Sequence, residues 1–192
     1  MDREAWNERY ASRPLLWDVD PGPFLSGEVG DMAPGRALDL GAGEGRTTLW
    51  LADRGWTVTA VDFSDVAIER GRERAEVAGV GDSIEWVCAD LSDYSPEGRT
   101  FDLVLSMFIH LPRPERRRVY GLAVGSLAPG GTILVVGYDT SHARDGQGGP
   151  RDPAILFTPE DIVEDLPGLR IDRAESFRVG DAVDAVVRAV KA

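Results

Sequence analysis

Apolar and polar positions alternate along most of the chain in a pattern that predicts a layered α/β structure. Short apolar runs predict five strands, near residues 36–41, 57–62, 84–88, 101–107 and 131–138. Amphipathic stretches between them predict helices near residues 45–54, 65–78 and 114–128. Strands and helices that alternate in this way indicate a mainly parallel sheet with helices on both of its faces.

The two ends of the chain add elements to this core. Residues 3–12 predict a short helix, and residues 22–32 predict a second helix that is interrupted by glycine. Near the other end, two strands at residues 170–177 and 182–190 are expected to form an antiparallel hairpin. The sheet should therefore contain about seven strands.

Residues 139–157 break the pattern and are expected to form a loop. The stretch Thr140–Pro153 lacks apolar periodicity and contains glycines and prolines, and loops of this length are commonly functional or mobile. We interpret the loop as an active-site lid. Thr158 then predicts a helix start. We expect one domain over residues 1–192, with residues 1–32 as a helical cap.

A glycine-rich turn follows the first core strand and indicates a nucleoside site. Gly41, Gly43 and Gly45 remove side chains where the backbone must turn tightly and approach a ligand. Asp62 ends the next strand, about 20 residues after the first glycines, which is the offset expected when one βαβ unit carries both elements. Its two carboxylate oxygens suit the hydroxyl groups of a ribose.

The spacing of the glycines separates two kinds of nucleoside-binding fold. A dinucleotide fingerprint has the spacing G-x-G-x-x-G, whereas here the third glycine comes one residue early and Arg46 stands in its place. The segment Asp39–Gly45 instead resembles the first motif of the class I S-adenosylmethionine-dependent methyltransferases, acid-x-Gly-x-Gly-x-Gly. Later motifs of that family resemble, in the same order, Cys88–Leu91, Phe101–Met107 and Leu127–Gly137.

This resemblance covers residues 33–140 best, and it implies both a fold and a cofactor. The fold is a Rossmann-like, doubly wound and mainly parallel sheet of about seven strands that ends in an antiparallel hairpin. The cofactor is S-adenosylmethionine, which leaves as S-adenosylhomocysteine. No nicotinamide or metal is implied, and we find no Cys/His spacing typical of a zinc site.

The resemblance also implies roles for individual residues. Asp39 and the backbone at Gly41 would hold the methionine end of the cofactor, and Asp62 the ribose. Asp90 and the amide of Leu91 would hold the adenine. The other residues implied for the cofactor site are Ala42, Gly43, Arg46, Phe63, Met107 and Phe108, of which the last two would lie beside the methionine portion.

Residues 43–62 look most similar to small bacterial methyltransferases of the tellurite-resistance type. Proteins of that type usually carry Cys where Ala42 stands and Asn where Thr47 stands. Their chalcogen-handling residues have no counterpart here, so the acceptor of that group is not carried over to this chain.

The composition of the chain narrows the class of acceptor. The formal net charge is -12, so a nucleic acid would meet a surface of its own sign. The only basic cluster is Arg113–Arg118, in which Arg116–Arg118 are expected to be a solvated helix start. Methyltransferases that attack the nitrogens of bases or of glutamine amides usually carry D/N-P-P-Y/F after the fourth strand, where this chain has Ser106–Pro112. We therefore expect a small-molecule acceptor and no nucleic-acid partner.

The sequence gives less information on the cellular location and the oligomeric state of the protein than on its acceptor. No apolar run approaches the roughly 18 residues that a membrane span needs, and the first ten residues are too polar for a signal peptide. We expect a cytoplasmic protein without a membrane partner. Cys88, the one cysteine, is expected to be a small core residue. No sustained heptad pattern indicates an interface between copies, so the oligomeric state stays open.

Methyl transfer of this kind is an in-line displacement, in which the protein aligns the reactants, excludes water and supplies a base where the acceptor is protonated. Two histidines are the candidate catalytic residues: His110, in the loop after the fourth strand, and His142, in the expected lid. Each could equally be a solvated or capping residue. The candidate acceptor-binding residues are Tyr10, Trp17, Tyr138 and Arg151, although Tyr10 could be core packing and Arg151 an exposed loop residue.

Two alternatives remain at this level. A nicotinamide-dependent oxidoreductase has a related fold, but the early third glycine and the turn Leu127–Gly131 argue against it. A non-catalytic S-adenosylmethionine-binding protein would bind the cofactor and methylate nothing. A comparison of S-adenosylmethionine binding with nicotinamide binding distinguishes the methyltransferase from the oxidoreductase. A test for turnover distinguishes it from the non-catalytic protein.

Overall fold

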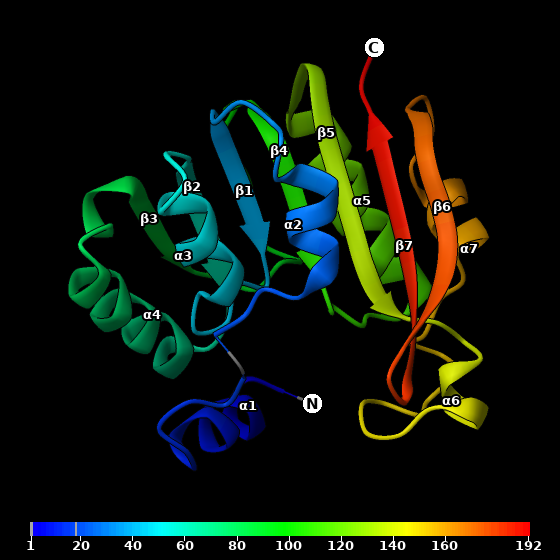
Figure 1. The fold of residues 1–192 in the computed structure, drawn as a ribbon, viewed down its shortest axis with the longest axis horizontal. Helices are drawn as coiled ribbons and strands as arrows, with labels where there is room; N and C mark the ends of the chain where they lie inside the picture. The colour runs from blue at the N-terminus through cyan, green and yellow to red at the C-terminus, as the bar shows by residue number, and fades with distance from the viewer. Residues whose placement is uncertain (1, 18) are drawn as a thin grey trace. The chain divides into compact units, whose positions relative to one another are not determined.

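The computed structural model describes residues 2–17 and 19–192 (Figure 1). The chain divides into two compact units. The first unit spans residues 1–94 and the second spans residues 95–192. The expectation of one domain over the whole chain stays a prediction.

The first unit contains three strands and the helices that accompany them. Its elements are α1 (Arg3–Ala11), α2 (Pro23–Val29), β1 (Arg36–Leu40), α3 (Arg46–Ala52), β2 (Thr57–Asp62), α4 (Asp65–Ala78), the 3-10 turn η1 (Gly81–Ser83) and β3 (Ile84–Cys88). The strands are parallel and lie in the order β3-β2-β1. The helices α3 and α4 pack against β2, and α4 also packs against β3.

Helix α4 shows how local sequence fixes these boundaries. The Ser64 side chain accepts a hydrogen bond from the Ala67 backbone N–H at 3.1 Å, which caps the first turn. Gly79 ends the helix with a φ of 72°, in the left-handed region that favours glycine. Between these ends, Ile68 and Ala75 are buried, so the helix lies with an apolar face against the strands.

The placement of Cys88 corrects the sequence prediction. This cysteine is exposed rather than part of the core. Within the first unit β3 is an outer strand that pairs only with β2, and its side chains are covered less completely than those of β1 and β2. Position along a strand did not reveal this, because burial depends on where the strand lies in the sheet.

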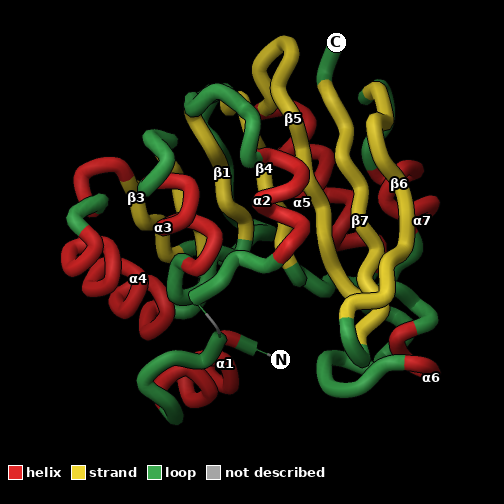
Figure 2. Tube along the Cα trace, in the orientation of Figure 1, coloured by secondary structure: helices red, strands yellow, loops and turns green. Residues whose placement is uncertain are grey.

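The second unit contains four strands and the hairpin. Its elements are β4 (Phe101–Met107), α5 (Arg113–Ser126), β5 (Leu127–Tyr138), α6 (His142–Asp145), α7 (Pro159–Asp165), β6 (Arg170–Val179) and β7 (Ala182–Val190). The strand order is β4-β5-β7-β6 (Figure 2). Strand β5 is parallel to β4, and β7 is antiparallel to both of its neighbours. The strand and hairpin predictions are therefore confirmed.

Strand directions in the second unit bring three strand ends together. Met107, the last residue of β4, pairs with Val136 near the end of β5. Tyr138, the last residue of β5, lies opposite Asp184 near the start of β7. We call this side of the second unit its carboxyl edge, and it is the side on which open α/β sheets bind their ligands.

The segment after β5 differs from the expected structureless loop in one respect. It contains the short helix α6, which is preceded by an Asx turn in which Asp139 Oδ1 accepts from the Ser141 N–H at 2.8 Å. The helix that begins after Thr158 is confirmed, and Thr158 and Asp161 form a reciprocal capping box.

The basic cluster of α5 is only partly solvated, so the prediction for Arg116 is wrong. Arg116 is 2% exposed and pairs with the buried Asp165 of α7, with 2.8 Å between Nε and Oδ2. The two helices lie 49 residues apart in sequence at this contact, and no local pattern marks a pairing of that range. Among the described residues, no helix is both long enough and apolar enough to cross a membrane.

Candidate functional site

The glycine loop of the first unit is held to the ends of β1 and β2 by backbone and carboxylate contacts. Gly41 and Ala42 donate their N–H groups to the Val61 carbonyl, at 2.8 and 3.0 Å. The glycines at 41, 43 and 45 all have positive φ, of 68°, 55° and 80°. Residues other than glycine rarely adopt a positive φ, so the three glycines of the sequence G-x-G-x-G determine the shape of the loop.

Asp62 connects this loop to the end of β2. Its Oδ2 accepts from the Gly43 N–H at 2.9 Å, and its Oδ1 accepts from the Ser64 N–H at 2.9 Å. Burial raises the pKa of this carboxyl group, and these backbone hydrogen bonds oppose the rise. Each oxygen keeps further acceptor capacity, so Asp62 can hold the loop and accept hydrogen bonds from a ligand diol together.

Asp39 is the most deeply buried acid of the loop region. It is 1% exposed, and its Oδ2 accepts from the Thr48 hydroxyl at 2.6 Å. Burial raises the pKa of Asp39 to about 7, with the Thr48 hydrogen bond and the Arg46 charge acting against burial. A carboxyl group that titrates near neutrality is a typical feature of a functional site.

The segment before β1 is tied to the glycine loop by a buried ion pair. Glu44 is 2% exposed, and its carboxylate accepts from the Leu16 N–H at 2.9 Å and from Arg70 Nη1 at 3.1 Å. The same Arg70 nitrogen also donates to the carbonyls of Tyr10 and Arg13. Glu44 therefore fixes the residues after α1 to the loop. The sequence did not reveal this role, because Glu44 stands at an x position of the G-x-G-x-G motif, where any residue is allowed.

Tyr10 lies against the glycine loop and is buried, as the packing alternative predicted. Its contact with the acceptor stays a prediction. A Cβ atom on Gly43 would lie 2.7 Å from the Tyr10 hydroxyl, so the two touch. Burial, with Asp62 nearby, raises the pKa of Tyr10, whose hydroxyl also forms a side-chain hydrogen bond with Trp17. Trp17 itself is 40% exposed.

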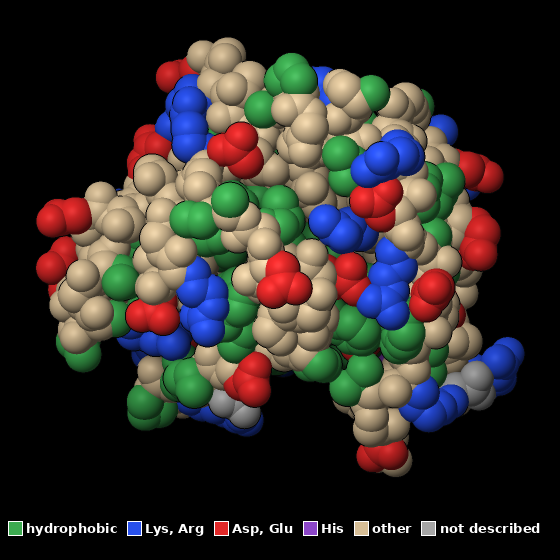
Figure 3. Space-filling model, turned by 45° about the horizontal axis from the view of Figure 1, so that its top comes forward, with side chains coloured by type: hydrophobic (Ala, Val, Ile, Leu, Met, Phe, Trp, Pro, Cys, Tyr) green, Lys and Arg blue, Asp and Glu red, His purple; other side chains and the backbone are tan. Residues whose placement is uncertain are grey.

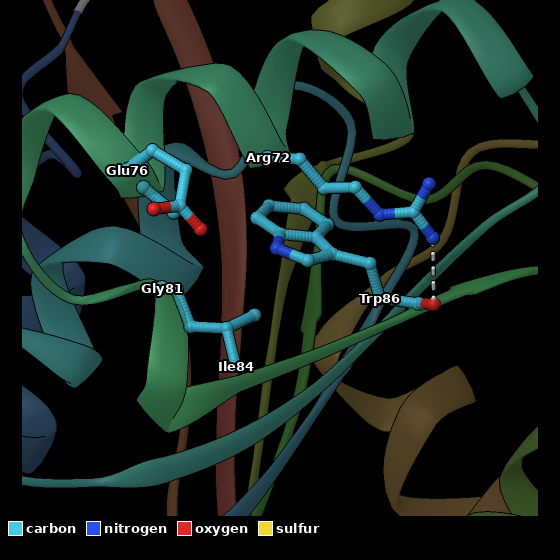
Figure 4. Close-up of a pocket in the computed structure, with 6 residues that line it drawn as sticks. Arg72, Glu76, Gly81, Ile84 and Trp86 are labelled. Carbon is cyan, nitrogen blue, oxygen red and sulfur yellow. Dashed lines mark hydrogen bonds between the residues drawn. The ribbon is translucent and has the colours of Figure 1, made fainter.

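A tryptophan of β3, Trp86, lies against α4 beside Arg72 and Glu76 (Figure 4). Its ring also packs on the glycine loop. A Cβ atom added at Gly71 would lie 2.4 Å from the Trp86 ring, and one added at Gly45 would lie 2.5 Å from it. Only glycine fits at either position. Beside this ring is a cavity of about 230 Å³, and Arg72 donates to the Trp86 carbonyl at 3.3 Å. Trp86 is thus placed to sense changes in the loop.

The expected adenine-binding residues follow β3. Asp90 Oδ1 accepts from the Ser92 N–H at 2.8 Å. This hydrogen bond closes a turn around Leu91. The Phe63 carbonyl lies 3.7 Å from the Cys88 sulfur, next to this turn. The first unit therefore brings the ends of its three parallel strands to one side, together with Asp39, Asp62 and Asp90.

In the second unit, the carboxyl edge carries a stack of rings. The Tyr138 ring lies between two imidazoles, with centroid distances of 5.3 Å to His110 and 4.2 Å to His142. Phe108 lies 5.4 Å from Tyr138, and Phe157 lies 5.9 Å from His110. The sequence predicted all of these residues for the site except Phe157.

The residues that follow β4 have a strained backbone. Phe108 has a φ of 60°, which is uncommon for a residue other than glycine, and its N–H donates to the Val136 carbonyl at 2.7 Å. Met107, before it, is buried. Such outliers persist where the surrounding structure imposes them, often at ligand-binding positions.

Both ring nitrogens of His110 are engaged by backbone. Nε2 accepts from the Tyr138 N–H at 3.0 Å, so a neutral ring carries its hydrogen on Nδ1. The backbone of Phe108 provides the other hydrogen bond, and burial lowers the pKa of His110 to about 4. In this conformation the imidazole would have to break a hydrogen bond before it could act as a base.

His142 is likewise committed to backbone partners. It is 0% exposed, its Nδ1 accepts from the Val183 N–H at 3.3 Å, and its Nε2 hydrogen-bonds to the Gly148 carbonyl at 2.9 Å. The glycines of this loop pack on the rings, since a Cβ at Gly149 would lie 2.6 Å from Tyr138. Arg151 donates to the Gly146 carbonyl at 3.0 Å, so it also holds the loop.

Charges are mixed on the face drawn in Figure 3, where basic and acidic side chains alternate without a continuous basic stripe. Among the residues that the structure describes, no three His, Cys, Asp or Glu side chains are grouped so that they could hold a metal ion.

A glycine loop that is fastened to an acid at the end of the next parallel strand defines a Rossmann-like, nucleoside-binding protein. Residues 37–131 match the family described as methyltransferase domain. This match covers just under half of the chain, and it supports the resemblance of this segment to the class I S-adenosylmethionine-dependent methyltransferases.

Similarity to individual proteins agrees with this family. The chain is 37% identical over 112 residues to a demethylmenaquinone methyltransferase of Clavibacter sepedonicus, a match that covers 58% of this chain and 44% of that protein. It is 31% identical over 105 residues to a tRNA 5-carboxymethoxyuridine methyltransferase of Escherichia coli K12, covering 54% of this chain and 40% of that protein. The matches thus span less than half the length of these relatives.

The fold of the chain is that of solved methyltransferases. The N-methyltransferase NodS from Bradyrhizobium japonicum WM9, solved in complex with S-adenosyl-L-homocysteine, aligns over 99% of each chain with a TM-score of 0.78. The sequence identity is 20%, so this likeness concerns the fold. It confirms the predicted Rossmann-like sheet with a C-terminal antiparallel hairpin.

Proposed function

We propose that this chain is an S-adenosylmethionine-dependent methyltransferase that acts on a small-molecule acceptor by direct in-line transfer. The observation that carries the proposal is the loop Gly41–Gly45, which is fastened to Asp62 by the Gly43 N–H at 2.9 Å and lies inside the segment that matches the methyltransferase family. NodS, which has the same fold, was solved with S-adenosyl-L-homocysteine.

The residues of the first unit fit the cofactor. Three glycines with positive φ leave the loop free of side chains where a nucleoside would approach. In our proposal Asp62 accepts the ribose hydroxyls, Asp39 and the Gly41 backbone hold the methionine end, and Asp90 with the Leu91 amide holds the adenine. Ala42, Arg46 and Phe63 complete the proposed set in this unit. Met107 and Phe108, which lie in the second unit, stay predictions for the methionine portion.

S-adenosylmethionine supplies an electrophilic methyl group on a sulfonium centre. The side chains of this protein then need only orient the reactants and exclude water, because the leaving group is a neutral thioether. We propose that the ring stack of His110, Tyr138 and His142 shapes the acceptor side, with Arg151 as a further acceptor contact. Tyr10 and Trp17, which lie in the first unit, stay predicted acceptor contacts. The backbone holds both imidazoles by hydrogen bonds. We therefore propose that the two histidines position the acceptor rather than accept its proton.

Charge supports the choice of a small acceptor. The net charge of -12 opposes a polyanion, and the face in Figure 3 lacks a basic stripe. One relative is by name a tRNA methyltransferase, so methylation of tRNA by this chain would contradict this part of the proposal. The finer similarity to tellurite-resistance methyltransferases rests on residues 43–62, and we propose it for the cofactor-binding part alone.

Calorimetric titration of the purified chain tests the proposed cofactor. We expect saturable binding of S-adenosylmethionine and S-adenosylhomocysteine and none of NADH, because Arg46 stands where a dinucleotide loop has glycine. Binding of NADH without the adenosyl ligands would replace the proposal by the oxidoreductase alternative. Binding of S-adenosylmethionine with no turnover of a broad acceptor panel would favour a non-catalytic protein.

The affinity for S-adenosylhomocysteine is expected to depend on pH through Asp39. The pKa of this group is raised to about 7, so its ionised fraction rises from about one tenth at pH 6 to about nine tenths at pH 8. An ionised carboxylate favours the ligand ammonium, and the dissociation constant should therefore fall about tenfold over this interval.

Two controls separate Asp39 from other causes of this pH dependence. Asp39→Asn should flatten the profile because the side chain no longer titrates. In the parent, 5′-methylthioadenosine should show little dependence because it lacks the amino-acid end. An affinity that falls as the pH rises would contradict the assignment of Asp39 to the ligand ammonium.

A further inference from the structure

Asp184 is a buried acid at the carboxyl edge of the second unit that no part of the proposed function uses. It is 4% exposed, and its Oδ1 is buried without a hydrogen-bond partner among the described residues. Buried carboxylate oxygens nearly always have partners, because an unmet acceptor costs the desolvation free energy of the group. An exception of this kind requires a physical reason.

A neighbouring acid at the same edge shows what a structural carboxylate looks like there. Asp139 is 6% exposed, and its Oδ1 accepts from the Ser141 N–H at 2.8 Å and the Ser141 hydroxyl at 2.7 Å. Its Oδ2 accepts from the Ser176 hydroxyl at 2.7 Å. Asp139 is satisfied by its own protein, whereas Asp184 is not.

The surroundings of Asp184 favour a positively charged ligand group. In the strand register Asp184 lies directly opposite Tyr138 on β5 and Phe177 on β6. Cross-strand partners project to the same face of a sheet, so the carboxylate has an aromatic residue on either side. The Tyr138 ring is already stacked with two imidazoles, and Arg173 lies 4.5 Å from the centroid of the Phe177 ring. The unpartnered carboxylate is therefore the group that supplies charge and hydrogen-bond acceptors to a ligand cation.

The nearby histidine does not fill this role. His142 interacts electrostatically with Asp184, but its Nδ1 accepts from the Val183 N–H and its Nε2 is engaged by the Gly148 carbonyl. Burial raises the pKa of Asp184 to about 6, with His142 acting against burial. The group is therefore mainly ionised at neutral pH and lacks a cationic hydrogen-bond donor.

We propose that Asp184 is an acceptor-binding residue whose unpartnered carboxylate oxygen pairs with an amine of the methyl acceptor. This inference rests on the proposed function, because it takes the carboxyl edge of the second unit as the acceptor side. It narrows the acceptor class to small molecules that carry a protonatable amine. The loop from Gly146 to Gly149 packs on Tyr138 and His142, at the same edge of the second unit.

Binding of a matched pair of probes tests the proposal without turnover. Benzylamine and benzyl alcohol have similar shapes and differ in charge, and their binding to the parent protein is measured by ligand-observed NMR with S-adenosylhomocysteine present. We expect benzylamine to bind at least about tenfold more tightly, as for a desolvated charge pair. Equal binding of the two probes, or no binding of benzylamine, would overturn the proposal.

Variants identify the group responsible. Asp184→Asn should abolish the preference for the amine, whereas Asp139→Asn should keep it. If Asp139→Asn does not fold, Asp181→Asn in the exposed turn of the hairpin serves as the control. A preference that survives Asp184→Asn would overturn the proposal as well.

Stability supplies an independent readout. At pH 8, Asp184→Asn should raise the thermal midpoint because it removes an unpaired buried charge, and Asp139→Asn should lower it because it breaks a satisfied site. A lower midpoint for Asp184→Asn would mean that the carboxylate is structural. Binding of S-adenosylhomocysteine is measured in the parent and in every variant. If the parent does not bind this ligand, the result counts against the proposed function rather than against the role of Asp184.

Discussion

Replacement of Asp165 by alanine is expected to lower the free energy of unfolding by about 3–5 kcal/mol, the usual cost of leaving a buried charge without its partner. The Arg116 side chain is 3% exposed and the Asp165 side chain 0%. Both Nε and Nη2 of Arg116 lie 2.8 Å from Asp165 Oδ2. Without the carboxylate, this buried guanidinium loses its 2.8 Å counter-charge and has little access to water, and the Phe157 ring at 5.3 Å does not replace a charge.

The other arginines near Asp165 should contribute little to this loss. Arg117 Nε lies 2.9 Å from Asp165 Oδ1, but Oδ1 has no well-aligned hydrogen bond and the Arg117 side chain is 56% exposed. Arg113 is 43% exposed and also pairs with Glu164. Both side chains can turn to water, and exposed ion pairs contribute about 1 kcal/mol or less.

Urea unfolding measures the effect, with two probes that report different parts of the chain. All five tryptophans precede residue 95, so tryptophan fluorescence follows the first unit, whereas far-ultraviolet circular dichroism follows both units. The control is Glu164→Ala, whose side chain is 64% exposed and whose loss should cost about 0.5 kcal/mol or less. An Asp165→Ala variant as stable as Glu164→Ala would refute the buried-pair argument.

A double substitution tests whether the cost comes from the stranded charge. Arg116→Met with Asp165→Leu removes both charges and keeps apolar volume, so its stability should lie within about 1 kcal/mol of the parent. If the double variant is as unstable as Asp165→Ala, the loss reflects packing between α5 and α7 rather than the unpaired guanidinium.

Local sequence was enough to predict most of the fold and the cofactor loop. Strand and helix boundaries near the glycine loop follow from signals within a few residues, such as Ser64 as N-cap and Gly79 at the helix end. The G-x-G-x-G spacing and Asp62 are likewise close in sequence, because one βαβ unit carries them. Features that depend on residues close together in sequence, such as helix ends and the glycine loop, can therefore be predicted from the sequence.

Contacts between distant segments explain what the sequence did not reveal. Arg116 and Asp165 lie 49 residues apart, and Glu44 and Arg70 lie 26 apart, so neither pair forms a motif. Asp184 appeared as one polar residue in an apolar strand, and only the pairing with β5 and β6 shows its position between aromatic residues. Burial of a charge is a property of the folded chain, which composition and spacing do not encode.

Asp62→Ala is expected to weaken S-adenosylhomocysteine binding about 100-fold, or by about 2.7 kcal/mol, the range of hydrogen bonds to a charged group. The proposed ribose contacts would be lost, and the Gly43 N–H would lose the acceptor that now lies 2.9 Å away. Trp86, which packs on Gly45, makes the titration measurable by fluorescence. Asp53→Ala, at an exposed position with 74% of its side chain accessible, should bind as the parent does.

The ligand can be altered to separate a direct ribose contact from a collapsed loop. The parent should bind the 2′-deoxy analogue of S-adenosylhomocysteine more weakly than the natural ligand, because Asp62 loses a donor partner. In Asp62→Ala the two ligands should bind almost equally, because the interaction has already been removed. If the variant still discriminates between them as strongly as the parent, Asp62 acts only by shaping the loop, and another group must recognise the ribose.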